Sequence, residues 1–140
     1  MNKVVKYYSI LFFALISFSE CKKDKDEVPN VYTDLYIYTT DPAFSPLNAI
    51  SGSQYFNGGS NGIVVFRKSQ NEFMAYDRHC PYKTSEKNQV SVDASTLIVV
   101  DSKCNSKFLL TDGSPNSGPS SAPLKRFQTA FDGSVLHIYN

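Results

Sequence analysis

The chain has 140 residues, enough for one domain preceded by a short leader. Lys and Arg number 14 against 13 Asp and Glu, so the net charge of +1 argues against a nucleic acid or an acidic polymer as partner. Nine Tyr and ten Phe, with no Trp, favour β-strands.

Residues 1–20 have the features of a secretory signal peptide. Lys3 and Lys6 precede an apolar run over residues 7–18, which is too short to span a bilayer comfortably. The next residue, Cys21, stands where a lipoprotein is cleaved and lipidated, although Glu20 replaces the small residue that usually precedes that cysteine.

Charged residues follow Cys21 directly. They resemble the tether behind the lipidated cysteine in surface lipoproteins of Bacteroidetes-type bacteria. We therefore expect a lipid anchor and tether over residues 21–30. The protein would then be held to a membrane of the cell envelope, on its periplasmic or its outer surface. The alternative is a solvated linker after an ordinary signal peptide.

The rest of the chain, residues 31–140, has the pattern of an all-β domain. No run of ten or more residues has helical periodicity, and the cluster 57–62 and the Asp-Gly pairs at 112–113 and 132–133 mark turns. About nine short strands are predicted, at residues 31–40, 49–56, 63–67, 73–77, 89–92, 97–101, 108–111, 124–131 and 134–139.

Two cysteines remain in this domain, Cys80 and Cys104. The hairpin at residues 63–77 leads into Cys80, and the hairpin at 89–101 leads into Cys104. A lone cysteine pair in an exported chain forms a disulfide or supplies two metal ligands.

Short motifs follow the second cysteine in a characteristic order: Asn105-Ser106-Lys107-Phe108, Asp112-Gly113, Gly118-Pro119, Pro123-Leu124 and a closing hairpin. Over residues 62–140 this order resembles the C-terminal half of a Rieske domain. The resemblance implies antiparallel sheets with a small two-loop subdomain, and the [2Fe–2S] cluster of a Rieske ferredoxin-like electron-transfer component. In that family two thiolates and two imidazoles, from Cys-x-His and Cys-x-x-His loops, hold the cluster.

The ligands themselves match this pattern poorly. Cys80 falls on the first cysteine, Tyr82 on the first histidine, Asp101 on the second cysteine and Cys104 on the second histidine. A second alignment of the loop, with Cys104 as its cysteine, puts Lys107 on the histidine instead. Both histidine positions are lost either way. Phenolate and carboxylate are harder ligands than thiolate.

His79 is a weak candidate for a replacement ligand, since neighbouring side chains in an extended loop point in opposite directions. It also does not make Cys80 a nucleophile, because adjacency in sequence does not place a base within reach of the thiol. No catalytic residue is predicted.

Three hypotheses for the cysteine pair remain open. In the first, a Cys80–Cys104 disulfide clamps the two former cluster loops of a non-enzymatic envelope protein, whose partner is another, unidentified envelope protein. In the second, Cys80 and Cys104 hold a [2Fe–2S] cluster with Tyr82 and Asp101 at the remaining positions. In the third, the pair is a thiol–disulfide redox module.

Overall fold

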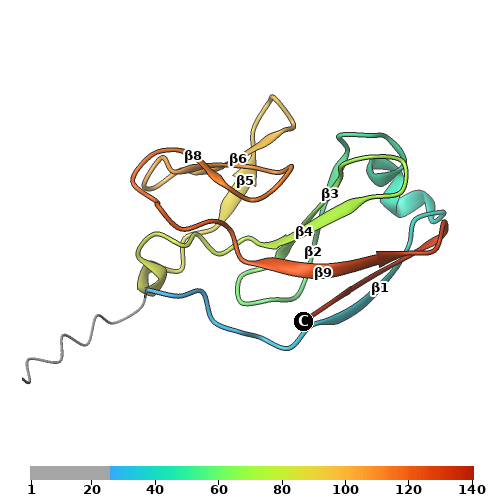
Figure 1. The fold of residues 1–140 in the computed structure, drawn as a ribbon, viewed down its shortest axis with the longest axis horizontal. Helices are drawn as coiled ribbons and strands as arrows, with labels where there is room; N and C mark the ends of the chain where they lie inside the picture. The colour runs from blue at the N-terminus through green and yellow to red at the C-terminus, as the bar shows by residue number, and fades with distance from the viewer. Residues whose placement is uncertain (1–25) are drawn as a thin grey trace, which may run out of the picture.

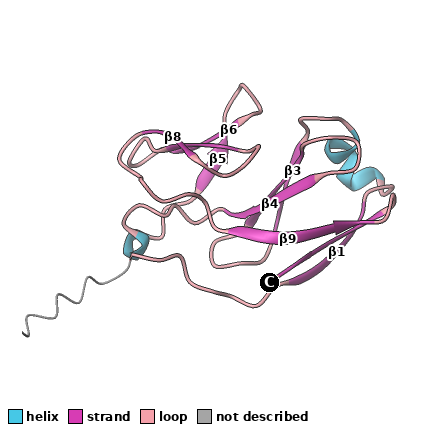
Figure 2. Ribbon diagram, viewed as in Figure 1, coloured by secondary structure: helices cyan, strands magenta, loops and turns pink. Residues whose placement is uncertain are grey.

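The computed structural model describes residues 26–140 and contains ten strands and two short 3-10 helices (Figures 1 and 2). All the sheet pairings are antiparallel. The prediction of an all-β domain is confirmed, with one strand more than expected. The lipid anchor predicted at Cys21 lies outside the described residues. Within them, no helix has the length and apolar character needed to cross a membrane.

Six strands form a base sheet and four form a smaller sheet. The base has the order β1 (Asp34–Tyr38), β10 (Val135–Tyr139), β9 (Arg126–Phe131), β4 (Phe73–Asp77), β3 (Ile63–Arg67) and β2 (Ser53–Phe56). The smaller sheet has the order β5 (Val90–Val92), β6 (Ile98–Asp101), β7 (Lys107–Leu109) and β8 (Pro115–Ser117). The 3-10 helices are η1 (Pro42–Asn48) and η2 (Thr84–Glu86).

The smaller sheet is an insertion in the base. The chain leaves the base after β4 and returns to it at β9, so that β5 to β8 form a subdomain beside one end of the base sheet (Figure 1). Both cysteine loops belong to this insertion: one connects β4 to β5, and the other connects β6 to β7. This is the arrangement that the Rieske resemblance implied.

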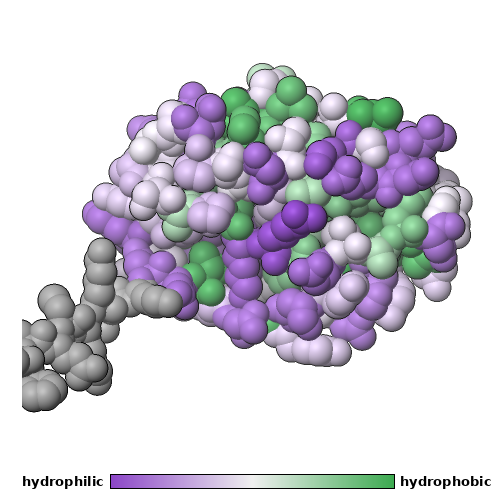
Figure 3. Space-filling view, viewed as in Figure 1, coloured by the Kyte–Doolittle hydropathy of each residue, from purple (hydrophilic) through white to green (hydrophobic). Residues whose placement is uncertain are grey.

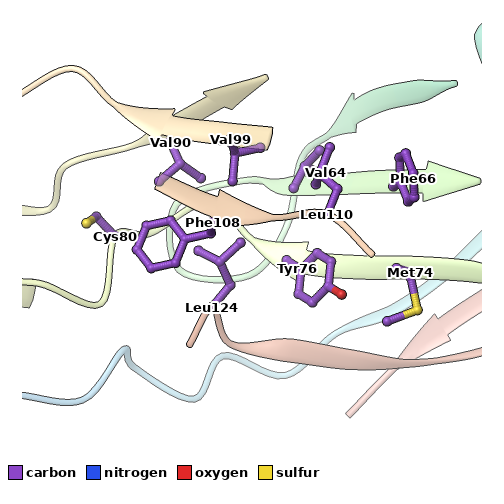
Figure 4. Close-up of a cluster of buried hydrophobic side chains, with 10 residues drawn as sticks. All are labelled: Val64, Phe66, Met74, Tyr76, Cys80, Val90, Val99, Phe108, Leu110 and Leu124. Atoms are coloured by element: carbon purple, nitrogen blue, oxygen red, sulfur yellow. The ribbon is translucent and has the colours of Figure 1, made fainter. Parts of the chain in front are cut away.

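Strands β3 and β4 are buried on both faces because two hydrophobic clusters share them. Alternate residues of the two strands enter a cluster under the smaller sheet: Val64, Phe66, Met74 and Tyr76, which pack with Cys80, Val90, Val99, Phe108, Leu110 and Leu124 (Figure 4). The intervening residues enter a second cluster with β1, β9, β10 and η1. This explains why the two strands read as continuous apolar runs instead of alternating ones.

Strand β1 shows the opposite pattern. Ile37 is buried, whereas its neighbours Tyr36 and Tyr38 are more than half exposed, because successive side chains of a strand point to opposite faces. One face of this edge strand therefore meets solvent.

Two local elements were not predicted. Residues 42–48 form η1; its first turn is capped by the Asp41 carboxylate, which accepts from the Ala43 N–H at 2.9 Å. Strand β8 lies inside a Gly-, Ser- and Pro-rich segment for which no strand was expected. Its three residues have low strand propensity, and pairing with β7 supplies the order that propensity does not.

Candidate functional site

The first cysteine loop is fastened where β4 ends. The buried Asp77 carboxylate accepts three backbone hydrogen bonds: from Ser60 at 2.6 Å, from Asn61 at 3.2 Å and from His79 at 2.9 Å. The turn over residues 58–62 thus wraps around this carboxylate. The sequence indicated the turn but not its partner, because nothing local points to an acceptor 16 residues away.

His79 holds the same loop from inside. Its side chain is buried, with Nε2 2.8 Å from the Thr84 carbonyl oxygen and Nδ1 2.9 Å from the Ser60 hydroxyl oxygen. Because a carbonyl only accepts, Nε2 carries a proton and donates to it, and Nδ1 shares a hydrogen bond with the hydroxyl. Both ring nitrogens are therefore engaged, and neither is directed at the sulfur of Cys80.

The second cysteine loop is a tight turn between Asp101 and Ser106. The Asn105 N–H donates to the Asp101 carbonyl at 2.8 Å, and the Asp101 N–H donates to the Ser106 carbonyl at 2.9 Å. Asn105 has a φ of +60°, a left-handed conformation that asparagine adopts more readily than most residues. The short span brings Asp101 and Cys104 to the same side of the turn.

Gly118 supports this turn from behind. At a φ of +93° it passes so close that an added Cβ would lie 2.5 Å from the Ser106 Cα. Nearby, the Ser120 N–H donates to the Ser106 hydroxyl at 3.2 Å. The Gly118-Pro119 motif therefore allows a close approach between the β8 segment and the second loop.

The two loops meet at their sulfur atoms. Cys80 Sγ and Cys104 Sγ are 3.9 Å apart, and both cysteines are free. Ligand-type atoms of Cys80, Asp101 and Cys104 all lie within 4.8 Å of one another. The structure thus brings together three of the predicted site residues, but the predicted disulfide is not formed in it.

Polar groups surround Cys104. Its Sγ lies 3.1 Å from Asp101 Oδ2 and 3.1 Å from the Ser106 hydroxyl oxygen, and the Ser106 N–H donates to it at 3.4 Å. A thiol has one proton, so Cys104 donates to one of these oxygens at a time. Sequence reasoning missed Ser106 as part of the site, although the Asn-Ser-Lys-Phe motif contains it.

Cys80 has a more apolar environment. It is fully buried at the end of the cluster under the smaller sheet, and in Figure 4 its sulfur points away from the other labelled side chains. Burial, reinforced by the hydrogen bond to Asp101 and that residue's charge, raises the pKa of this thiol far above its usual range. Cys80 is therefore protonated at neutral pH and is not an activated nucleophile.

Asp101 is charged. Burial by itself would raise the pKa of this carboxyl group, but hydrogen bonds from the Cys80 thiol, from the Lys103 N–H and from Cys104 outweigh it and hold the pKa below its usual value. The Lys103 N–H donates to Oδ1 at 2.7 Å, which leaves Oδ2 facing the sulfur atoms. An anion and two thiols share the site.

The residues present do not fit a Rieske-type [2Fe–2S] cluster. Such a cluster needs imidazole ligands on one iron. The chain has two histidines. His79 is engaged as described, and His137 is on β10, stacked on Tyr36 with Nε2 2.7 Å from Asp34 Oδ1. Tyr82, at a predicted ligand position, packs beside the cluster under the smaller sheet.

The N-terminal segment of the described chain touches the first loop. The Asp26 carboxylate accepts from the Thr84 N–H at 2.7 Å and from the Thr84 hydroxyl. Lys125 Nζ donates to the Pro29 carbonyl at 2.7 Å and so ties the same segment to the base. A cavity of about 350 Å³ lies between this segment, Pro81 and the residues before β9.

The face of the molecule seen in Figure 3 is mainly hydrophilic, with scattered hydrophobic residues.

No family model matches the chain, and no curated protein matches it. Among solved structures, the chain is similar to the ferredoxin of carbazole 1,9a-dioxygenase from Nocardioides aromaticivorans IC177. That likeness has 16% sequence identity and a TM-score of 0.47, and it covers 62% of this chain and 83% of the ferredoxin. A function for this chain therefore rests on the geometry of its own site.

Proposed function

We propose that this chain is a non-enzymatic lipoprotein of the cell envelope, built on a Rieske-like scaffold that has lost the conventional cluster. Its working group is the thiol pair Cys80 and Cys104. Oxidation of the pair closes a disulfide that clamps the two loops together, and Cys21 carries the lipid that anchors the protein.

The distance between the two sulfur atoms carries this proposal. Cys80 and Cys104 come from separate loops, yet their Sγ atoms are only 3.9 Å apart. The sulfur–sulfur bond of a disulfide is about 2.05 Å long. A rotation of the partly buried Cys104 side chain would bring its sulfur closer to that of Cys80. Closing a loop of this length would stabilise the fold by roughly 3–4 kcal/mol in the chain-entropy model.

The oxidation needs an electron acceptor, and a disulfide-bearing oxidoreductase of the envelope supplies one. The Cys104 thiolate attacks the partner's disulfide and expels one partner thiolate. Cys80 then loses its proton, attacks the mixed disulfide and expels the second. The partner gains two electrons, and two protons leave the cysteine pair. The raised pKa of Cys80 makes the reverse exchange slow, which favours a structural clamp over a redox module.

The tether is short enough to fix the orientation of this site. Five peptide units separate Cys21 from Asp26, and a fully extended chain of that length reaches about 18 Å at most. Since Asp26 binds Thr84 in the first cysteine loop, a lipid on Cys21 would hold the two-loop end close to the membrane. A partner embedded in the membrane or bound to it would then reach Cys104 most easily.

Intact mass tests the clamp. The protein is purified from membranes in mild detergent, without reductant or chelator. One sample is weighed under native conditions, and the free thiols of a second sample are alkylated while the protein is unfolded. We expect a mass lower by two hydrogens and no alkylation at Cys80 or Cys104. Two free thiols in the exported protein would refute the clamp. A mass raised by bound iron and sulfide would also refute it, and would indicate an electron-transfer protein instead.

Fractionation tests the anchor separately. The Cys21→Ser variant should leave the membrane fraction while keeping the Cys80–Cys104 bond. Unchanged membrane association of this variant would remove the anchor from the proposal.

A further inference from the structure

Three ligand-type side chains converge where the two loops meet, and we propose that the reduced site binds one tetrahedral divalent transition-metal ion, for which Zn²⁺ is the best fit. The ligands are Cys80 Sγ, Cys104 Sγ and Asp101 Oδ2. This inference deepens the proposed function and rests on the same thiol pair: the disulfide and the metal complex are alternative states of one site.

The sulfur–sulfur distance favours a shared ion. Two thiolates bound to one tetrahedral ion, with metal–sulfur bonds of about 2.3 Å, lie about 3.8 Å apart. The observed separation of Cys80 Sγ and Cys104 Sγ is 3.9 Å. Asp101 Oδ2 lies 3.1 Å from Cys104 Sγ, and the ligand atoms of all three residues lie within 4.8 Å of one another. Small side-chain rotations suffice to bring all three to one ion.

The backbone around the site is arranged as it would be for thiolate ligands. The Ser106 N–H donates to Cys104 Sγ at 3.4 Å. In the first loop the Tyr82 N–H acts to lower the pKa of Cys80, against the larger effect of burial. Each of these N–H groups is two residues after its cysteine. Hydrogen bonds of this kind stabilise the charge of metal-bound sulfur. The same hydrogen bonds stabilise an uncharged thiol much less.

A backbone hydrogen bond also orients the Asp101 carboxylate. The Lys103 N–H binds Asp101 Oδ1 at 2.7 Å, so Oδ2 is the oxygen left to face the sulfur atoms. Outer contacts that fix a ligand's orientation are typical of metal sites. Asp101 is fully buried, and a buried carboxylate is stabilised by a cation or by hydrogen-bond donors.

The ligand types select the metal. Two thiolates and one carboxylate suit Zn²⁺, whereas Ca²⁺ and Mg²⁺ require mostly oxygen ligands. On binding, the two thiols release two protons, and the ion with its three anionic ligands carries a net charge of −1. Three protein ligands leave a fourth position for water.

Cobalt provides the test, because Co²⁺ takes the place of Zn²⁺ and absorbs visible light. The full chain carrying Cys21→Ser, which leaves Cys80 and Cys104 as its only thiols, is reduced and titrated with Co²⁺. We expect one ion per chain, a visible spectrum typical of tetrahedral cobalt and a sulfur-to-cobalt charge-transfer band. Zn²⁺ should displace the cobalt and bleach both features.

Variants assign the ligands. Cys80→Ser and Cys104→Ser should each remove the two-thiolate band. Asp101→Asn keeps an acceptor oxygen for the Lys103 N–H, and should weaken binding by on the order of 10–100-fold. Asp93→Asn, in the turn between β5 and β6, is the matched control and should bind as the parent does. Far-UV circular dichroism establishes that each variant is folded.

The outcomes separate this inference from the proposed function. If the folded, reduced chain gives no cobalt spectrum, or if Cys80→Ser keeps the two-thiolate band, the metal site is refuted while the disulfide test stands by itself. If cobalt binds but the exported protein never forms the disulfide, the clamp fails and the metal site remains. Oxidation of the pair should abolish cobalt binding.

Discussion

The two cysteine loops reach the same point by different means. The first is fastened to the base sheet by the buried Asp77 carboxylate, and its sulfur belongs to a hydrophobic cluster. The second is a tight turn in close contact with Gly118, and its cysteine is partly buried, with its sulfur among polar atoms. One sulfur is fixed by the core, whereas the other is held by a few local contacts.

This difference assigns roles to the two thiols. Cys80 is buried and has a raised pKa, so it is poorly placed to react first. Cys104 is only partly buried, so we expect an oxidant or a metal ion to meet it first. The five predictions below test this division, from the largest expected effect to the smallest.

Removing the Asp77 carboxylate, which holds the first loop, should cause the largest loss of stability among these predictions. In Asp77→Ala three backbone N–H groups, of Ser60, Asn61 and His79, lose their acceptor in a buried place. We expect the free energy of unfolding to fall by roughly 4 kcal/mol, measured by urea denaturation.

Asp112→Ala is the matched control. Asp112 also accepts from an N–H two residues ahead, that of Ser114, but it is exposed. Its loss should cost about 0.5–1 kcal/mol. Equal losses in the two variants would contradict the special role given to Asp77.

Gly118→Ala should strain the second loop. The added Cβ would meet the Ser106 Cα at 2.5 Å and would also sit at an unfavourable positive φ. We expect a loss of roughly 3 kcal/mol in unfolding free energy, and faster alkylation of Cys104 as the turn loosens.

Gly133→Ala separates the two causes of this loss. Gly133 has a comparable φ of +104°, but nothing lies within 4 Å of its added Cβ. It should therefore show the backbone strain alone, roughly 1–2 kcal/mol. A loss as large as that of Gly118→Ala would mean that the contact with Ser106 is unimportant.

Alkylation of the reduced, metal-free protein compares the two thiols directly. Cys104 should react with iodoacetamide on the order of a hundredfold faster than Cys80, because Cys80 needs a local opening of the cluster. Peptide mass mapping of a time course measures both rates. Equal rates would remove the distinction between a fixed and an accessible sulfur.

The same thiols give a pH dependence with a defined sign. The folded state raises the pKa of Cys80 above its unfolded value, so the native state binds this proton more tightly. The contribution of Cys80 to stability is full below the ordinary thiol pKa and is lost as the pH rises above it, by up to about 1.4 kcal/mol per pH unit. Cys80→Ala should lack this loss.

The sequence predicted the parts of the fold that local patterns encode. Apolar runs gave β3 and β4 at their observed bounds, Ile63–Arg67 and Phe73–Asp77. Strand β8 and helix η1 were missed, because pairing with β7 orders the first and a proline-rich segment capped by Asp41 forms the second. A tertiary contact overrides weak propensity in β8, whereas a local cap begins η1.

The candidate site was predicted in its residues but not in its geometry. The resemblance to a Rieske domain brought Cys80, Tyr82, Asp101 and Cys104 into one hypothesis, and the structure brings the two cysteines and Asp101 together. The supports, Asp77 and Ser106, could not be found, because they act through partners that are remote in sequence or through backbone groups that any residue carries.

Tyr76 tests whether buried polar atoms in the cluster around Cys80 have hydrogen-bond partners. The buried thiol of Cys80 has Asp101 as a partner, whereas the Tyr76 hydroxyl is buried without a partner in the described part of the chain. Tyr76→Phe should therefore raise the free energy of unfolding by about 1 kcal/mol. Tyr36→Phe, on the exposed face of β1, should stay within about 0.5 kcal/mol of the parent. A clear loss in Tyr76→Phe would mean that the cluster satisfies this hydroxyl as it satisfies the thiol, and that burial alone does not distinguish Cys80.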